Sequence, residues 1–148
     1  MHNESNKFKP PVLFWIISVI ALLWNLMGCF QWFAQYNMWK NPASRENLPE
    51  AMQGIFDQQP EWTYAVFAIA VITGTLGCIG LLMRKSWAST LFLISLITVV
   101  FLQLYYLTTT DALEKLGPSS LFMPSMVILF AVFLLYYSKK STAQGILN

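Results

Sequence analysis

Four stretches of the chain contain no charged residue over a length that can cross a lipid bilayer. A helix rises about 1.5 Å per residue and the hydrocarbon core is roughly 30 Å thick, so about 20 apolar residues complete one crossing. In lipid a helix satisfies its own backbone N–H and C=O groups where no water reaches them. The stretches are 10–39, 62–83, 86–110 and 116–138. We therefore expect an all-α integral membrane protein.

Length and composition are consistent with a single four-span domain. Only 11% of the 148 residues are charged, compared with about 25% in soluble domains. Four crossings at about 12–36, 62–83, 86–108 and 120–138 use most of the chain. We predict one four-transmembrane-helix bundle over residues 1–148. The net charge of +2 is too small to indicate nucleic acid as a partner; membrane lipid is the expected surrounding.

The basic residues divide unevenly between the two sides of such a bundle. Six lie before the first span, between the second and third, or after the fourth; these are Lys7, Lys9, Arg84, Lys85, Lys139 and Lys140. The other side holds three, which are Lys40, Arg45 and Lys115. Cytoplasmic loops carry an excess of Lys and Arg. This distribution predicts that the N-terminus and the C-terminus are both cytoplasmic.

The first outer loop has the pattern of a short amphipathic helix over about residues 48–58. Its apolar residues follow the spacing of one helical face and are Leu48, Ala51, Met52, Ile55 and Phe56. Asn47 is the expected N-cap, with Glu50 three residues later, and Pro60 ends the helix. The helix can lie in the outer headgroup layer, or it can cap a cavity between the spans. The sequence leaves both roles open.

Polar side chains inside the spans are the candidate solute-lining residues, because positions facing lipid have no reason to be polar. Asn25, Thr73 and Thr98 are expected at one depth near the middle of the bilayer, and the glutamines lie nearer the outside. They either line an outward-facing vestibule or only make hydrogen bonds that set helix register. The full set is Asn25, Gln31, Trp32, Gln35, Thr73, Thr98, Gln103 and Tyr106.

Small residues and proline indicate how the spans pack. Gly74, Gly77 and Gly80 permit close approach of a neighbouring helix to the second span. Pro124 removes one backbone bond in the fourth span and predicts a bend there. Cys29 and Cys78 are expected at depths that differ by roughly 15 Å, so we predict buried free thiols rather than a disulfide.

No Asp, Glu, Lys, Arg or His lies inside any span, and the one histidine is His2. Proton relays, ion-coupled pumps and voltage sensors use ionisable groups at membrane depth. The sequence also lacks a nucleophile with a nearby base, a metal-ligand cluster and a glycine-rich phosphate loop. We therefore expect a protein that is not an enzyme and holds no cofactor and no metal.

Several segments together resemble a family of small bacterial four-span membrane proteins whose members are often labelled sugar transporters. The segments are 21–28 (ALLWNLMG), 60–62 (PEW), 74–78 (GTLGC), 84–88 (RKSWA), 117–118 (GP), 123–127 (MPSMV) and 137–140 (YSKK). The resemblance implies a multi-pass protein of the bacterial inner membrane and carries over no site residue. The small multidrug transporters also have four short spans, but they need a carboxylate in the first span, where this chain has Asn25.

Two classes of function remain. The first is a transporter-like protein for a small neutral solute such as a sugar, in which amide groups bond hydroxyls and two copies enclose the path. The second is a non-catalytic accessory or scaffold subunit that packs on a larger membrane partner through Gly74, Gly77 and Gly80. The placement of the glutamines separates them: a connected cavity favours transport, and a dry core favours the accessory role.

Overall fold

The structure is a computed structural model that describes residues 9–148. Within that range it is all-helical, with no strand. Four helices are long and apolar enough to cross a membrane: α1 (Val12–Lys40), α3 (Glu61–Leu82), α4 (Ala88–Thr109) and α6 (Phe122–Ala143), the last preceded by the 3-10 turn η2 (Pro118–Leu121). The predictions of an all-α chain and of four such helices are confirmed. His2 and Lys7 lie outside the described residues.

The helices end where proline or glycine interrupts them. α1 continues past residue 36, the predicted end of the first span, and stops at Asn41 because Pro42 disfavours helical geometry in the residue before it. Pro60 is the N-cap of α3. α6 runs five residues beyond the predicted end of the fourth span and terminates just before Gly145, which has φ of 79°. Both α1 and α6 thus extend beyond their uncharged stretches.

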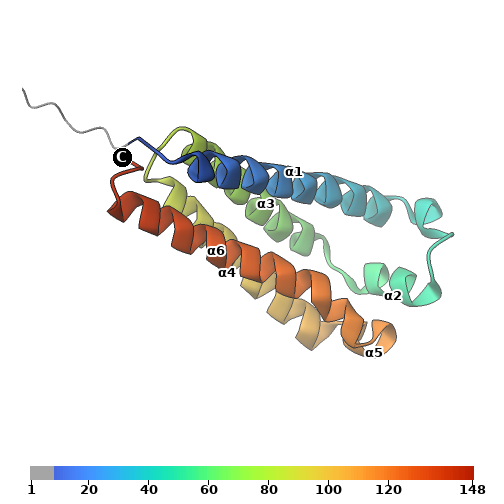
Figure 1. Ribbon diagram of the computed structural model, residues 1–148. Helices are drawn as coiled ribbons and strands as arrows, with labels where there is room; N and C mark the ends of the chain where they lie inside the picture. The colour runs from blue at the N-terminus through green and yellow to red at the C-terminus, as the bar shows by residue number, and fades with distance from the viewer. Residues whose placement is uncertain (1–8) are drawn as a thin grey trace, which may run out of the picture.

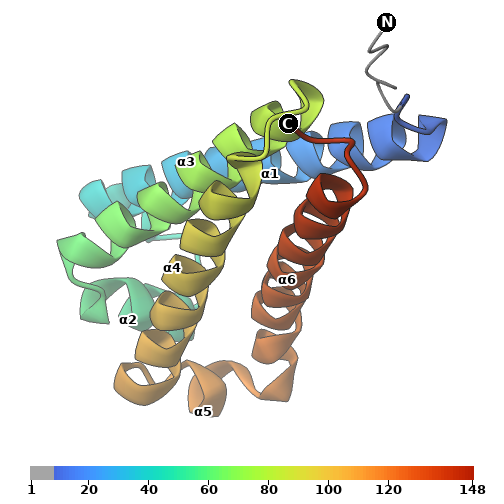
Figure 2. The same ribbon diagram turned by 90° about the vertical axis from the view of Figure 1, so that its left-hand side faces the viewer.

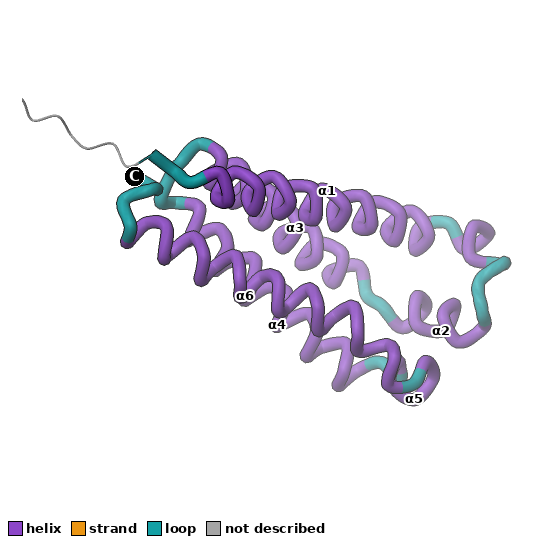
Figure 3. The backbone as a smooth tube through the Cα atoms, viewed as in Figure 1, coloured by secondary structure: helices purple, strands orange, loops and turns teal. Residues whose placement is uncertain are grey.

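The four long helices form two pairs that spread apart along their length (Figures 1 and 2). α3 packs against both α1 and α4, and α4 packs against α6. The C-terminus, the start of α1 and the α3–α4 turn lie at one end of the molecule, which we call the terminal end. α2 (Glu50–Gln58) and α5 (Ala112–Leu116) lie at the other, which we call the α2/α5 end. The tube in Figure 3 shows the α3–α4 turn as a short loop at the terminal end.

The segment between α1 and α3 is held together by a buried cation. Arg45, the last residue of the 3-10 turn η1 (Pro42–Arg45), donates from Nη1 to Oδ1 of Asp57 on α2 at 3.0 Å and lies over the ring of Phe56. Asn47 is not the N-cap of α2, contrary to the prediction. Pro49 takes that position, because the chain turns at Arg45–Leu48 and only becomes helical at Glu50.

A compact core fills the terminal end. Phe14, Cys78, Leu81 and Phe92 are almost fully buried there. Ile146 and Leu147, at 2% and 3% exposure, join them from the chain segment after α6. This end of the helix assembly is therefore tightly closed.

The segment after α6 is fixed to the α3–α4 turn by backbone hydrogen bonds. The N–H of Asn148 donates to the carbonyl of Arg84 at 2.9 Å, and the N–H of Ser86 donates to the carbonyl of Asn148 at 2.8 Å. Arg84 Nε donates to the carbonyl of Ile146 at 3.0 Å. Two turns that are distant in sequence thus form one closed layer across the terminal end.

The structure places the three glycines of α3 against neighbouring helices of the same chain. A Cβ at Gly77 would lie 2.8 Å from the ring of Phe92, and one at Gly80 would lie 2.8 Å from the ring of Trp87. A Cβ at Gly74 would overlap the side-chain oxygen of Asn25. All three glycines are buried, so this face of α3 is occupied by α1 and α4.

Pro124 lies in the first turn of α6 and not in a helix interior, so the expected reason for a bend in the fourth span is absent. α6 begins at Phe122, so Pro124 is the third residue of its first turn. The N–H groups of a first turn have no partner within the helix, and a proline there removes no hydrogen bond. The proline contributes to a cavity wall.

Candidate functional site

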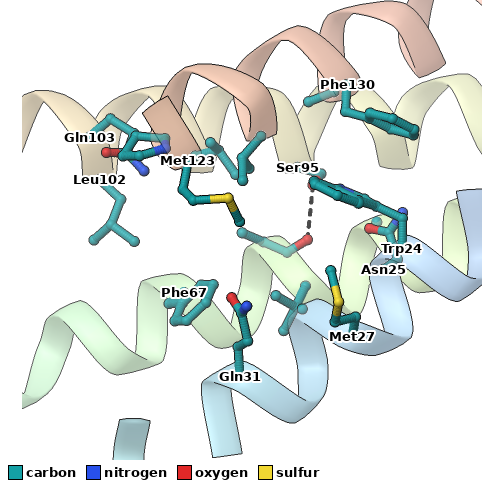
Figure 4. Close-up of a pocket in the computed structure, with 18 of the residues that line it drawn as sticks. Trp24, Asn25, Met27, Gln31, Phe67, Ser95, Leu102, Gln103, Met123 and Phe130 are labelled. Carbon is teal, nitrogen blue, oxygen red and sulfur yellow. Dashed lines mark hydrogen bonds between the residues drawn. The ribbon is translucent and has the colours of Figure 1, made fainter. Parts of the chain in front are cut away.

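A cavity of about 400 Å³ lies between the α1/α3 pair and the α4/α6 pair (Figure 4). All four long helices contribute to its walls, together with Gln59, the C-cap of α2, and Leu116, the last residue of α5. Its volume is within the range of small-molecule sites. The residues around it change in character from one end to the other.

Aromatic and aliphatic side chains close the cavity toward the terminal end. The ring of Trp24 on α1 stacks on that of Phe130 on α6, with centroids 4.8 Å apart. Phe92 and Leu134, both members of the core, line the same region. This aromatic floor separates the cavity from the closed terminal end.

Asn25 and Ser95 are the polar residues next to the floor. Asn25 Nδ2 donates to the carbonyl of Ala21 at 2.9 Å and to the sulfur of Cys78 at 3.3 Å. Ser95 Oγ donates to the carbonyl of Ala70 on α3 at 2.9 Å, the dashed line in Figure 4. Both side chains are therefore already engaged within the protein, and they stabilise the approach of α1 and α4 to α3.

The amide side chains that line the other half of the cavity have free hydrogen-bonding capacity. They are Gln31 and Gln35 of α1 and Gln103 of α4, and Tyr106 lies near Gln103 on α4. No described residue donates to or accepts from the side chains of Gln31, Gln35 or Gln103 in the structure. A glutamine amide offers two donors and one carbonyl acceptor. Three such groups can bind a neutral hydroxylated ligand without any charge.

Three predicted lining residues do not line the cavity. Trp32 donates from Nε1 to the carbonyl of Tyr64 at 2.8 Å and stacks on Tyr36, so it belongs to the α1–α3 contact. Thr73 donates to the carbonyl of Ile69 and Thr98 to that of Ile94, each within its own helix. Asn25, Thr73 and Thr98 therefore do not bond to one another as the predicted polar layer requires.

Other lining residues were not identified from the sequence. Gln59 reaches the cavity from the C-cap of α2, where its carbonyl accepts from Trp39 and its Oε1 accepts from Tyr64 at 2.6 Å. In the sequence, Trp24 and Phe130 cannot be distinguished from other apolar span residues, because only the packing of α1 near α6 brings their rings together. A tryptophan far from either span end, as Trp24 is, was the one signal available.

Two short helices meet across the α2/α5 end of the cavity. Lys115 of α5 lies against Gly54 of α2, with its Nζ 3.3 Å from the position of a Cβ there. Ile55 of α2 and Leu113 and Leu116 of α5 border a second, smaller cavity of about 150 Å³. Gln103 and Tyr106 line both cavities, so α2 and α5 lie next to the amide region.

The side of the cavity between α1 and α6 is lined by exposed residues. Met27 of α1 is 45% exposed and Met123 of α6 is 46% exposed, although both line the cavity. Gln31, one helical turn beyond Met27, is also exposed. Figure 4 shows Met27 and Gln31 directed from α1 toward the space that Met123 enters from α6.

The chemistry of the walls is neutral. None of the described lining residues carries a formal charge. Within residues 9–148 no group of three His, Cys, Asp or Glu side chains is placed to hold a metal ion. Cys29 and Cys78 are both free thiols. What the walls offer a ligand is apolar surface, one phenol and neutral amides.

Comparison of the chain with protein-family models, with curated proteins and with solved structures gives no match. The resemblance to the small bacterial four-span family therefore stays a prediction, and the site is interpreted from its own geometry.

Proposed function

We propose that this protein is a four-span membrane bundle that binds a small neutral solute, such as a sugar or a sugar-bearing molecule, and acts as a transporter-like protein without enzymatic activity. The observation that carries the proposal is the cavity in which Gln31, Gln35 and Gln103 present unbonded amides. Paired amides in a dry helix contact would have favoured the accessory role instead.

The proposed orientation places the α2/α5 end outside a bacterial inner membrane and both termini in the cytoplasm. Arg84, Lys85, Lys139 and Lys140 all belong to segments at the terminal end. Lys40, Arg45 and Lys115 belong to the α2/α5 end. The larger number of basic residues at the terminal end supports its assignment to the cytoplasm. The cavity would then face outward, above a closed cytoplasmic end.

The alternative is an accessory subunit that packs against a larger membrane partner. Gly74, Gly77 and Gly80 were the surface assigned to that contact, and the structure buries all three against helices of the same chain. An accessory role would need another surface. A homodimer remains part of the transport proposal, because four helices with an open side enclose a path only incompletely.

Uptake into proteoliposomes tests the proposal. The panel is a set of labelled neutral sugars together with their short-chain alkyl glycosides, compared with protein-free liposomes of the same lipid. We expect at least one member to enter faster with the protein present. Gln31→Met combined with Gln103→Met removes two amides at nearly constant side-chain length and should reduce that uptake at least fivefold.

Thr98→Val is the matched control, because the Thr98 hydroxyl bonds its own helix and does not line the cavity. This variant should transport as the unsubstituted protein does. Equal uptake with and without protein for every member of the panel would overturn the transport proposal. Unchanged uptake in the double glutamine variant would show that the transported solute does not bind at the glutamines of this cavity.

A further inference from the structure

The cavity is elongated and its polarity is graded along its length. On α1 the lining residues run from Trp24 to Gln35, and on α4 from Phe92 to Gln103. Each interval is 11 residues, which corresponds to about 16 Å along a helix. The free amides lie in the half near the α2/α5 end, and the other half ends on the aromatic floor. A ligand that fills both halves needs a polar part and an apolar part.

The exposed residues place the opening at the side of the molecule. Met27 and Met123 flank the space between α1 and α6, and both are about half exposed while lining the cavity. These helices are membrane-spanning by length and composition, so a side opening between them faces lipid. The contact of α2 with α5 partly covers the route from the α2/α5 end.

Resting on the proposed function, we propose that the ligand is a neutral amphiphile with a hydroxylated head and an apolar chain, which enters from the adjacent leaflet between α1 and α6. The head binds at Gln31, Gln35 and Gln103, and the chain lies along Val127 and the Trp24–Phe130 pair. Met27 and Met123 flank the entrance with flexible side chains that can adapt to ligands of different shape.

The neutral lining selects against charged lipid heads. A phosphate is bound in proteins by Arg, Lys or backbone N–H groups that supply charge-assisted hydrogen bonds. The described cavity lining contains no basic side chain, and its residues on α1 and α4 lie in helix interiors, where backbone N–H groups are bonded to carbonyls of the same helix. Removing a phosphate from water into such walls is costly. A glycoside or polyol head has hydroxyl groups that the amides can satisfy.

Native mass spectrometry of the protein in lipid nanodiscs tests the proposal, with glucose and octyl glucoside as the two probes. The two share one head and differ only in the chain. We expect octyl glucoside to be retained one to one at a concentration at least tenfold lower than glucose. The Gln31→Met, Gln103→Met double variant should lose that adduct, and Thr98→Val should keep it.

Each other outcome has a defined meaning. Glucose retained as well as octyl glucoside would overturn the amphiphile proposal and leave neutral-solute binding intact. Octyl glucoside retained equally by the double glutamine variant would show partition outside the cavity and overturn this proposal. Retention of neither probe, together with no uptake of any panel member, would overturn both proposals. A Trp24→Leu variant that loses octyl glucoside but not glucose would further support the placement of the chain.

Discussion

The indole of Trp24 on α1 lies nearly parallel to the ring of Phe130 on α6, at a centroid distance of 4.8 Å and an interplanar angle of 16°. This pair joins the first long helix to the last at the bottom of the cavity. A second ring pair, Phe14 with Tyr137, joins the same two helices closer to the terminal end. Both ring pairs between α1 and α6 therefore lie toward the terminal end, away from the free amides of the cavity.

A double-mutant cycle measures the strength of the Trp24–Phe130 contact. Trp24→Leu and Phe130→Leu should each destabilise the protein, and their coupling should be about 1 kcal/mol, as for other stacked aromatic pairs. Reversible unfolding in a denaturing detergent gives the free energies. Tyr136→Leu, at a position 63% exposed, is the control partner and should show no coupling to Trp24→Leu. Coupling of equal size in both cycles would contradict the stacked geometry.

Gly77→Ala should destabilise the protein by about 1–3 kcal/mol, because the added methyl group would come within 2.8 Å of the Phe92 ring. Gly28→Ala is the matched control. The new Cβ there would meet Val71 at 3.4 Å, an ordinary contact, so stability should be unchanged or slightly improved. Thermal unfolding of both variants in the same detergent tests this difference, and a Gly77→Ala variant as stable as Gly28→Ala would show that α3 and α4 are not this close.

Ile146→Ala should lower the free energy of unfolding by about 2–4 kcal/mol, because the side chain is 2% exposed in the core of the terminal end. Gln144→Ala, at an exposed position two residues earlier, should change it by less than about 0.5 kcal/mol. Hydrogen exchange at the amide of Ser86 should accelerate in the Ile146 variant, since that amide is bonded to the same segment. If the two variants had the same free energy of unfolding and the same exchange rate at Ser86, the packing of the segment after α6 on the α3–α4 turn would be contradicted.

Asp57→Asn should loosen α2, because it leaves the buried guanidinium of Arg45 without its carboxylate. The Asp57 side chain is largely exposed, so we expect a modest effect of about 1 kcal/mol, seen as roughly fivefold faster hydrogen exchange over Glu50–Gln58. Glu46→Gln removes a nearby charge that forms no ion pair among the described residues and is the control. If exchange over α2 were the same in both variants, the Arg45–Asp57 ion pair would not be what holds α2 in place.

The four long apolar helices were predictable because their signal is local. Uncharged runs of 20 or more residues can be read directly from the sequence, although α1 continues past the predicted end at 36 and stops just before Pro42. The course of the chain after Ser141 was not predictable, because Ile146 and Leu147 are buried only by their return to the α3–α4 turn. The role of Pro124 was hard to predict for a related reason: the helix starts two residues later than the predicted span, which puts the proline in the first turn, where it costs no helix hydrogen bond.

The cavity was predictable only in part, because polarity indicates that a residue faces protein but not which space it faces. Gln31, Gln35, Gln103, Asn25 and Tyr106 line it. Thr73 and Thr98 are polar at the right depth, but a threonine hydroxyl can bond a carbonyl of its own helix and then needs no partner elsewhere. Trp32 is taken up by the contact with α3.

Cysteine reactivity tests most directly whether the glutamines line an open cavity. Gln35→Cys, Gln103→Cys and Thr98→Cys would each be introduced into a Cys29→Ser, Cys78→Ala background and treated with a small neutral methanethiosulfonate in nanodiscs. We predict that the cysteines at 35 and 103 react at least tenfold faster than the one at 98, which lies off the cavity. Equally slow reaction at all three positions would contradict the cavity and, with it, the proposed binding site.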